Sequence, residues 1–363
     1  MRVGLVLCGD LETVSGGYLY DRQLVEHLRR RGDEVAVVSL GQRRYGEGLL
    51  HNLSGRLAGD IAGMDVDLLL EDELAHPSLA LLNRRLQARI RCPIVGVVHH
   101  LRCAEDHPPI IRRLYEAVER SYLRSVDGLL CSSEATRREV QEVCRCRRPS
   151  EVAHPAGDRF RDLPEELEIA ERARREGPME VVFLGNLIPR KGLHVLLDAV
   201  ARLPAGSVHL SVCGSPEADR RYAEMMRRRV GELSIDERVS FRGGIADEDL
   251  AALLRRSHVL AVPSHLEGFG IVYLEGMGFG LPAIASAGGG ARELVTDGVD
   301  GFLVGGENAA AAVSARLEHL ARDRARLAEM GSAARRRYRR HPSWETTMKR
   351  ARRFLVEMAG GEQ

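Results

Sequence analysis

The chain has 363 residues, of which 44% are hydrophobic and 29% charged, and its formal net charge at pH 7 is +1. This length exceeds what one hydrophobic core usually serves, so the composition predicts two globular domains. The near-neutral charge supplies no long-range field that would attract a nucleic acid, so a nucleic-acid-binding protein is not expected. No run of about 18 uncharged apolar residues is present, so a membrane-spanning protein is not expected either.

Apolar runs of strand length alternate with helical patterns along the whole chain, which is typical of parallel α/β sheets. A polar stretch from Arg159 to Gly177, with Pro164 inside it and Pro178 after it, separates two such series and predicts a linker. The predicted strands cover residues 2–8, 35–40, 66–70, 93–98, 127–131, 180–184, 208–213, 238–241, 258–262 and 282–285. The sequence therefore predicts a first domain over 1–160, a linker over 161–178, a second domain over 179–343 and a terminal helix over 344–363.

Two features of the first domain lie at the carboxyl ends of predicted strands, where open α/β sheets bind ligands. Gly16 and Gly17 follow the first strand and begin a helix, so their N–H groups are suited to a phosphate or a sugar. His99 and His100 end the strand that begins near Ile94. The alternatives are an ordinary Gly-Gly turn and a histidine whose ring is satisfied by a neighbouring backbone group.

A basic motif follows the first strand of the second domain. After the apolar run 180–184, a turn begins at Gly185 and leads to Arg190 and Lys191, just before a helical pattern. Of the 53 basic residues only Lys191 and Lys349 are lysines. An ammonium group at the carboxyl end of a strand is suited to a phosphate oxygen. The alternative is a surface lysine at the start of a helix.

A glycine-rich turn in the second domain joins the apolar run 259–262 to a helix that begins at Ile271. The turn Gly268-Phe269-Gly270 lets backbone N–H groups approach a ligand, and the first helical turn favours an anion. Glu267 precedes this turn. Glu275 lies about a turn and a half into the helix, near enough to accept hydrogen bonds from a sugar hydroxyl on that anion. The alternative is a pair of acids on a solvated helix face.

The residues around these two glutamates resemble a known family. The run Pro263-Ser264-His265-Leu266-Glu267-Gly268-Phe269-Gly270, with Glu275 and the later Gly280-Leu281-Pro282-Ala283-Ile284-Ala285-Ser286, is similar to the retaining glycosyltransferases of family 4. The resemblance covers nearly the whole chain and is strongest over 180–305. It implies the α/β GT-B fold, two Rossmann-like domains with parallel sheets facing across a cleft, in which the terminal helix returns to the first domain.

The resemblance assigns roles to residues of this sequence. It implies that Glu275 binds the nucleotide ribose, that Glu267 lies against the transferred sugar, and that Arg190 and Lys191 stabilise the diphosphate as leaving group. His99 is the residue expected to touch the transferred sugar. The implied catalytic residues are Arg190, Lys191, Glu267 and His99. The implied donor-binding residues are Gly16, Gly17, Gly185, Glu267, Gly268, Phe269, Gly270, Ile271 and Glu275.

Two positions depart from the family pattern. His100 stands where family members often carry an acidic or small residue, so the sequence does not decide whether His99 or His100 faces the cleft. Pro155 stands where the family usually shows Asn before Gly-x-Asp, while Asp158 and Phe160 remain in register. Binding near the domain joint is therefore expected to differ from the family.

The expected activity is transfer of a sugar from a nucleotide-diphosphate sugar, with UDP the favoured nucleotide, with net retention and with neither metal nor other cofactor. A non-catalytic nucleotide-sugar-binding subunit is an alternative, because binding and turnover use many of the same residues. A nicotinamide oxidoreductase would need Gly-x-Gly-x-x-Gly after a strand, which the turn at Gly185 lacks. A metal-dependent GT-A enzyme would use Asp-x-Asp, but Asp65-Val66-Asp67 precedes its predicted strand.

Cysteine usage and surface charge bear on location and partners. Seven cysteines, an odd count, predict reduced thiols and a cytoplasmic protein. Cys144 and Cys146 lack the second pair that a zinc site needs. The expected partners are the sugar donor and an unidentified acceptor, a glycan, lipid or small molecule, with no nucleic acid. The basic amphipathic segment Ile110 to Leu123 permits peripheral membrane contact, but a core-facing helix with a solvated outer face is the favoured prediction.

Overall fold

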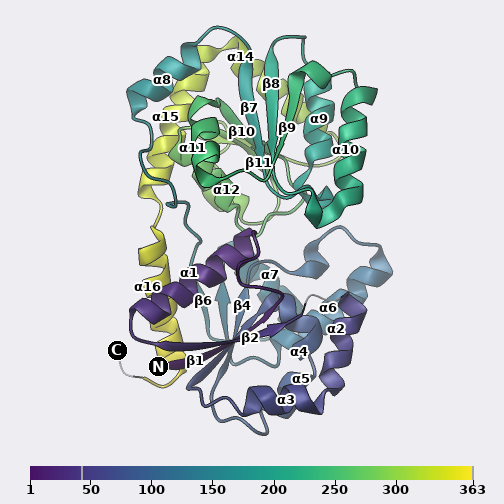
Figure 1. The fold of residues 1–363 in the computed structure, drawn as a ribbon, viewed down its shortest axis with the longest axis vertical. Helices are drawn as coiled ribbons and strands as arrows, with labels where there is room; N and C mark the ends of the chain where they lie inside the picture. The colour runs from purple at the N-terminus through teal and green to yellow at the C-terminus, as the bar shows by residue number, and fades with distance from the viewer. Residues whose placement is uncertain (42–43, 362–363) are drawn as a thin grey trace. The chain divides into compact units, whose positions relative to one another are not determined.

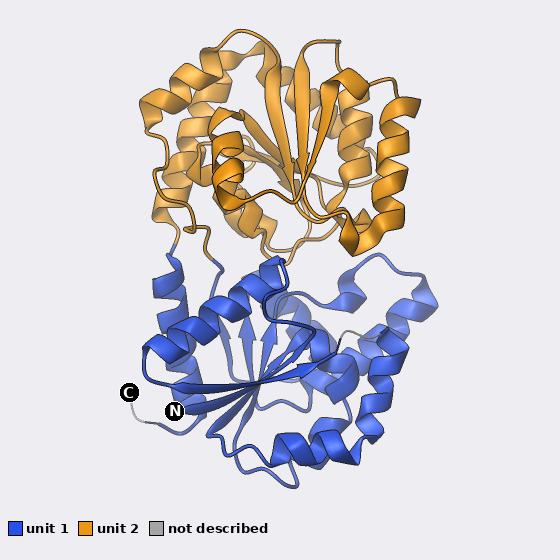
Figure 2. Cartoon of the chain, in the orientation of Figure 1, with its two compact units in different colours: residues 1–155, 342–363 blue, residues 156–341 orange. Residues whose placement is uncertain are grey.

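The computed structural model describes residues 1–41 and 44–361. The chain divides into two compact units, unit 1 formed by Met1–Pro155 with Pro342–Gln363, and unit 2 formed by Ala156–His341 (Figure 2). Each unit contains one six-stranded sheet, and its paired strands are parallel. This confirms the predicted α/β class with two parallel sheets.

Unit 1 is built around a sheet in the order β2-β1-β3-β4-β5-β6 (Figure 1). Every residue of the central strand β4 is buried, as expected for a parallel sheet covered on both faces. The strands are β1 (Arg2–Cys8), β2 (Glu34–Leu40), β3 (Leu68–Asp72), β4 (Ile94–Val98), β5 (Gly128–Cys131) and β6 (Ser150–Val152). The α-helices are α1 (Gly16–Arg30), α2 (Tyr45–Leu50), α3 (Gly55–Ala62), α4 (His76–Leu79), α5 (Leu82–Leu86), α6 (Pro109–Leu123), α7 (Glu134–Cys144) and α16 (Trp344–Met358).

Unit 2 has a sheet in the order β12-β11-β10-β7-β8-β9 (Figure 1). Its central strand β10 is buried throughout. The strands are β7 (Met179–Leu184), β8 (Val208–Cys213), β9 (Val239–Gly243), β10 (Val259–Val262), β11 (Ala283–Ser286) and β12 (Gly301–Val304). The α-helices are α8 (Glu166–Arg174), α9 (Leu193–Ala201), α10 (Arg220–Glu232), α11 (Asp247–Arg256), α12 (Ile271–Gly278), α13 (Ala291–Leu294), α14 (Ala309–Arg322) and α15 (Arg324–Arg340).

The ten predicted strands are all present, with ends that differ from the prediction by at most two residues. The prediction missed β6 and β12, which have three and four residues, too few to show a hydrophobic period.

The predicted linker over 161–178 is not a linker in the structure. Within it α8 forms part of unit 2 and packs against α15. Arg172 of α8 is buried and donates hydrogen bonds of 3.0 Å to the backbone oxygens of Phe279 and Gly280. The polar outer face of α8 made this helix resemble a linker in the sequence.

The terminal helix α16 belongs to unit 1. Ser343 caps its first turn, and Arg352 pairs with the buried Asp33, Nε to Oδ2 at 2.6 Å. Trp344 meets Tyr20 of α1 edge to face, with ring centroids 5.9 Å apart. An ion pair and an aromatic contact therefore hold the end of the chain to helix α1 and its loop.

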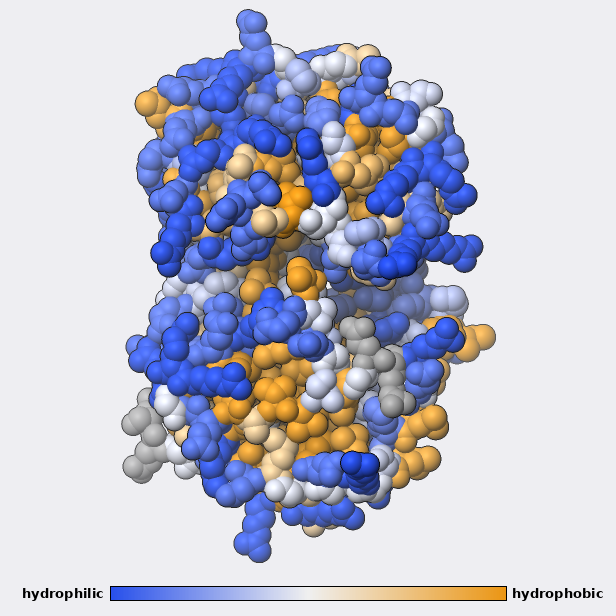
Figure 3. Space-filling view, in the orientation of Figure 1, coloured by the Kyte–Doolittle hydropathy of each residue, from blue (hydrophilic) through white to orange (hydrophobic). Residues whose placement is uncertain are grey.

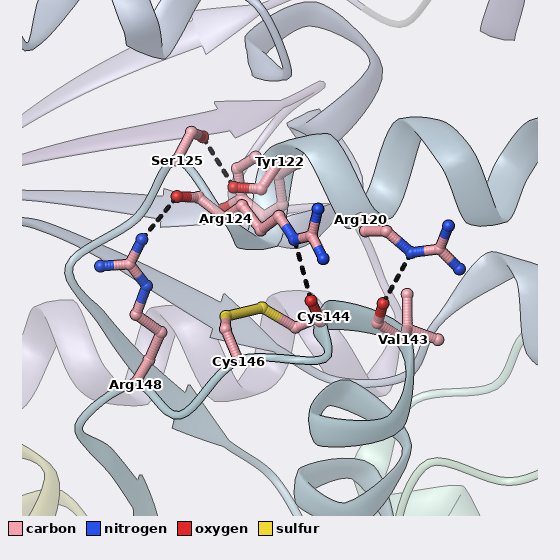
Figure 4. Close-up of a disulfide and its surroundings, with 8 residues drawn as sticks. All are labelled: Arg120, Tyr122, Arg124, Ser125, Val143, Cys144, Cys146 and Arg148. Atoms are coloured by element: carbon pink, nitrogen blue, oxygen red, sulfur yellow. Dashed lines mark hydrogen bonds between the residues drawn. A yellow bond between two sulfur atoms is a disulfide. The ribbon is translucent and has the colours of Figure 1, made fainter.

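A disulfide joins Cys144 and Cys146 at the end of α7 (Figure 4). This corrects the prediction that these thiols are reduced. Arg145 between them adopts a left-handed conformation, φ +52°, which brings the two side chains to the same side. Arg124 donates from Nε to the backbone oxygen of Cys144 at 2.9 Å. The free cysteines of the described residues are Cys8, Cys92, Cys103, Cys131 and Cys213.

The first two turns of α6 contradict the favoured prediction for this helix. Ile110, Ile111 and Leu114 are 81%, 38% and 49% exposed, whereas Glu119 and Leu123 are buried. Glu119, buried with Tyr122 and Leu123, accepts hydrogen bonds from the backbone N–H groups of Arg102 and Cys103, in the segment before α6.

Figure 3 shows hydrophobic side chains gathered on the visible face of unit 1, where β1 and β2 lie in Figure 1. Val37 of the edge strand β2 is 39% exposed. Among the described residues, no helix combines the length and apolar character needed to cross a membrane.

Candidate functional site

The basic motif of unit 2 lies directly after β7, on a short 3-10 turn formed by Pro189–Lys191. Gly192 ends this turn with φ +72°, and a Cβ added there would come within 2.1 Å of the backbone oxygen of Pro263. Only glycine allows so close an approach of the two backbones. The loop after β7 is therefore held against the loop after β10.

This approach places Lys191 beside Glu267. Lys191 Nζ lies 2.7 Å from Glu267 Oε2, and Ser264 donates its hydroxyl to the same oxygen at 3.1 Å. Arg190 donates from Nη1 to the backbone oxygen of Leu266 at 2.9 Å. The two predicted motifs thus form one cluster, built from residues 76 positions apart in the chain.

Electrostatics keep this cluster charged. Burial alone would raise the pKa of Glu267, but the charges of Lys191 and Arg190, with hydrogen bonds from Lys191 and Ser264, lower it to about 2. For Lys191 burial dominates and lowers the pKa, the charge of Glu267 opposes this shift, and Arg190 adds to it. Charge outweighs burial for the pKa of Glu267 but not for that of Lys191, because Glu267 faces two cations, whereas Lys191 faces one anion and one cation. Glu267 is therefore ionised at neutral pH.

The turn between Glu267 and α12 is braced by glycines. Gly270 precedes α12 with φ +97°, a conformation that suits glycine. Gly289 and Gly290 follow β11 and lie against this turn: a Cβ at Gly289 would come within 2.1 Å of the Glu267 backbone oxygen, and the N–H of Gly290 donates to that oxygen at 2.8 Å. The first turn of α12, beginning at Ile271, is thus fixed next to the charged cluster.

Glu275 lies inside α12 and is almost fully buried, at 3% exposed. Its Oε1 is 2.6 Å from Nε of Arg159, which also pairs with Asp247. Burial raises the pKa of Glu275, and the charge of Arg159 opposes the shift. A Cβ at Gly157 would come within 2.7 Å of the Leu274 side chain, so Gly157 lets the chain before Arg159 pass close to α12.

In unit 1 the structure brings Gly17 and His99 together. Ser15 caps α1, and a Cβ added at Gly17 would meet the His99 ring at 3.1 Å. His99 Nε2 lies 3.3 Å from Oδ1 of the buried Asp21, and its ring meets Tyr20 edge to face at 5.2 Å between centroids. His100 instead lies 3.0 Å from Glu105, Nε2 to Oε1. His99, and not His100, is therefore the histidine at the glycine turn.

Buried acids surround His99. Burial would lower the pKa of His99, but the hydrogen bond to Asp21 and its charge raise it above the ordinary value. Asp72, at the end of β3, lies in the same group, and burial raises its pKa to about 8. A carboxylate oxygen of Asp21, a carboxylate oxygen of Asp72 and a ring nitrogen of His99 lie within 4.8 Å of one another, a spacing that suits a cation. A second group of this spacing consists of Glu73, His76 and Glu119.

The predicted residues therefore fall into two sets. Unit 2 brings together Arg190, Lys191, Glu267 and the glycine turn 268–270, with Glu275 further along α12. Gly185 lies at the end of β7 with its Cβ position 3.6 Å from the Lys191 side chain. Unit 1 brings together Gly16, Gly17 and His99.

Sequence reasoning missed Arg159, Asp21 and Asp72 as partners of predicted residues. Arg159 lies between Asp158 and Phe160, in the segment that departs from the family pattern. This departure was the one sign in the sequence that a residue there could have a special role. Asp21 lies four residues after Gly17, on the first turns of α1, and no motif singles it out. Asp65 and Asp67 lie before β3, as the sequence predicts, and both pair with Arg2 of β1.

Two Rossmann-like units with glycine turns and charged residues at the carboxyl ends of parallel strands define a GT-B glycosyltransferase fold. Sucrose-phosphate synthase from Thermosynechococcus elongatus has this fold with a TM-score of 0.82, at 21% identity over 99% of both chains. HepE of Anabaena, solved with UDP and glucose, gives a TM-score of 0.76 at 20% identity over 98% of this chain and 99% of that chain.

Residues 164–337 match the model of the glycosyl transferases group 1, and the chain belongs to this transferase family. D-inositol 3-phosphate glycosyltransferase of Corynebacterium efficiens is 35% identical over 168 residues, 44% of this chain and 40% of that protein. The Nocardia farcinica protein of the same name is 30% identical over 261 residues, 68% and 57% of the two chains.

A third relative is the GDP-mannose-dependent alpha-(1-6)-phosphatidylinositol monomannoside mannosyltransferase of Mycobacterium tuberculosis. It is 33% identical over 209 residues, 54% of this chain and 53% of the relative. The chain thus spans from about two fifths to just over half the length of these three relatives.

Proposed function

We propose that this chain is a metal-independent retaining glycosyltransferase that uses a nucleotide-diphosphate sugar. The observation that carries the proposal is the cluster of Arg190 and Lys191 beside Glu267 and the first turn of α12. Two cations and the positive end of a helix supply the charge that a departing diphosphate needs. The favoured nucleotide is UDP, as in the HepE complex, and GDP, named for the mycobacterial relative, is the second candidate.

The proposed mechanism follows from the charges of the cluster. Lys191 and Arg190 stabilise the diphosphate as the bond to the sugar breaks, and the acceptor attacks on the face that the diphosphate leaves, losing its proton to the leaving phosphate. Glu267, ionised and held by Lys191 and Ser264, positions the sugar and the lysine. His99 assists sugar placement, with its ring held at the glycine turn by Asp21, Nε2 to Oδ1 at 3.3 Å.

The acceptor is a glycan, a lipid or a small molecule, and no residue described above selects among them. A cytoplasmic location is part of the proposal and rests on the odd cysteine count. The disulfide of Cys144 and Cys146 gives it no support.

A panel of nucleoside diphosphates tests the donor site. UDP or GDP at 100 times its dissociation constant is expected to stabilise the folded protein by ~2.7 kcal/mol, with the same thermal shift in the presence and absence of EDTA. The reason is that Arg190, Lys191 and the α12 terminus already supply positive charge. Differential scanning fluorimetry measures this. A shift that disappears on chelation contradicts metal independence, and no shift with either nucleotide contradicts the donor site itself.

The stereochemistry of the product tests the mechanism. An α-linked donor is expected to give an α-linked product, since the proposed chemistry lies on the diphosphate side of the sugar. Proton NMR of early product gives the anomeric coupling before mutarotation. A β-linked product from an α-linked donor would overturn retention while leaving the donor-binding residues intact. A donor that binds but never turns over, with any acceptor class, would favour the non-catalytic binding subunit.

A further inference from the structure

A pocket in unit 2 lies away from the proposed donor site. It has a volume of about 520 Å³ and is lined by the amino-terminal parts of β7 and β8, by the segment around β9 and by the end of α11. The cluster of Lys191 and Glu267 instead follows the carboxyl ends of β7 and β10. None of the residues that line the pocket belongs to this cluster, and the pocket's volume lies within the range of small-molecule sites.

Three arginines line this pocket: Arg238, Arg242 and Arg256. The side chains of Arg242 and Arg256 are exposed, and within residues 1–41 and 44–361 their guanidinium groups make no hydrogen bond or ion pair. Arg238 donates only from Nη1, to the backbone oxygen of Leu203 at 3.1 Å, while its Nε and Nη2 are buried without a partner. Buried donors in native proteins are nearly always satisfied, so the Nε and Nη2 groups of Arg238 call for an acceptor.

The carboxylates of the pocket do not satisfy the arginines. Glu180 and Glu237 also line it, which leaves a formal charge of +1 from three arginines and two glutamates. Glu180 is engaged by His209, Nδ1 to Oε2 at 3.1 Å. Neither glutamate lies within ion-pair distance of the three guanidinium groups in the described part of the chain. Arginines elsewhere in unit 2 do find carboxylates, for example Arg229 with Asp198 at 2.6 Å.

We propose that this pocket binds a small organic oxyanion, a phosphate monoester, through Arg238, Arg242 and Arg256. Guanidinium groups present a fork of N–H donors that matches phosphate oxygens. The carbon atoms of Pro178 and Val208 line the same pocket, and its volume exceeds what a bare phosphate needs, so an organic body fits beside the anionic group. The site is separate from the donor site and does not depend on the proposed transferase activity.

The test is titration calorimetry of the full chain with inorganic phosphate at constant ionic strength, with the donor site saturated by UDP or, if GDP is the nucleotide that binds, by GDP. We expect saturable binding, and a dissociation constant raised about tenfold or more in the double variant Arg242→Gln/Arg256→Gln, since each removes a charge-assisted hydrogen bond. The matched control is Arg221→Gln/Arg228→Gln on α10, which removes the same charge from equally exposed positions of unit 2 that do not line the pocket. Its affinity is expected to stay within twofold.

Three outcomes would overturn the proposal: no saturable binding, binding unchanged in the Arg242/Arg256 variant, or an equal loss in both variants, which indicates a response to net charge. Circular dichroism establishes that both double variants are folded. Glycerol 3-phosphate and acetate are then titrated under the same conditions. Tighter binding of glycerol 3-phosphate supports a phosphate monoester, whereas tighter binding of acetate overturns this choice of anion.

Discussion

Replacing Lys191 by alanine is expected to lower turnover by a factor on the order of 10²–10³, with a smaller change in the affinity for the intact sugar donor. Loss of one preorganised electrostatic contact to a developing charge has effects of this size. Charge on the leaving diphosphate grows towards the transition state, so an ammonium group placed there acts mainly on kcat. Steady-state kinetics with the donor identified by the nucleotide panel, together with calorimetric donor affinity, measure both quantities.

The chain offers a matched control for this experiment. Lys349, the other lysine, is exposed on α16, and Lys349→Ala is expected to leave kcat and KM unchanged. Because Lys191 is the partner of the buried Glu267, its removal also leaves a carboxylate without its ion pair, so thermal melting must show that the variant is folded. An increase in KM with kcat intact, in a folded protein, would show that Lys191 binds the donor equally in ground and transition states and has no leaving-group role.

Replacing Glu275 by glutamine is expected to raise the dissociation constant of the nucleoside diphosphate about tenfold or more, with little change in kcat at saturation. A hydrogen bond to a charged group contributes ~1.5–3 kcal/mol, and a ribose contact is present in ground and transition states alike. Glutamine keeps the shape of the side chain inside the tightly packed α12, so the substitution removes mainly the charge. Calorimetric titration with UDP and GDP measures the effect.

Arg159→Gln separates the ribose role of Glu275 from its ion pair. Both substitutions remove the ion pair between Arg159 and Glu275 at 2.6 Å, so both are expected to lower the melting temperature. Only Glu275→Gln removes the carboxylate that would meet the ribose. If Arg159→Gln weakens nucleotide binding as much as Glu275→Gln does, Glu275 acts through the structure of α12 and the ribose assignment is wrong.

The placement of motifs on the sheets could be predicted from the sequence because it depends on local backbone geometry. The apolar run 180–184 predicts a strand, and Arg190 and Lys191 therefore lie at its carboxyl end. The glycines around Phe269 predict a turn before a helix, and Gly270 has the positive φ that such a turn requires. In contrast, the exposure of Ile110 on α6 could not be predicted, because an amphipathic pattern does not say how far along the helix its partner elements reach.

The sequence by itself determined two α/β domains, ten of the strands, and the residues that follow each of these strands. These are properties of hydrophobic period and turn chemistry, which act over a few neighbouring residues. Only the tertiary structure decided the partners: Glu267 for Lys191, 76 positions away, Arg159 for Glu275, 116 positions away, and Asp21 for His99, 78 positions away. Such pairs depend on how separate segments pack, since burial and a close charge together set the state of each group. Packing of separate segments also accounts for α8, which lies in the polar stretch predicted as a linker, and for the pocket that Arg238, Arg242 and Arg256 line together.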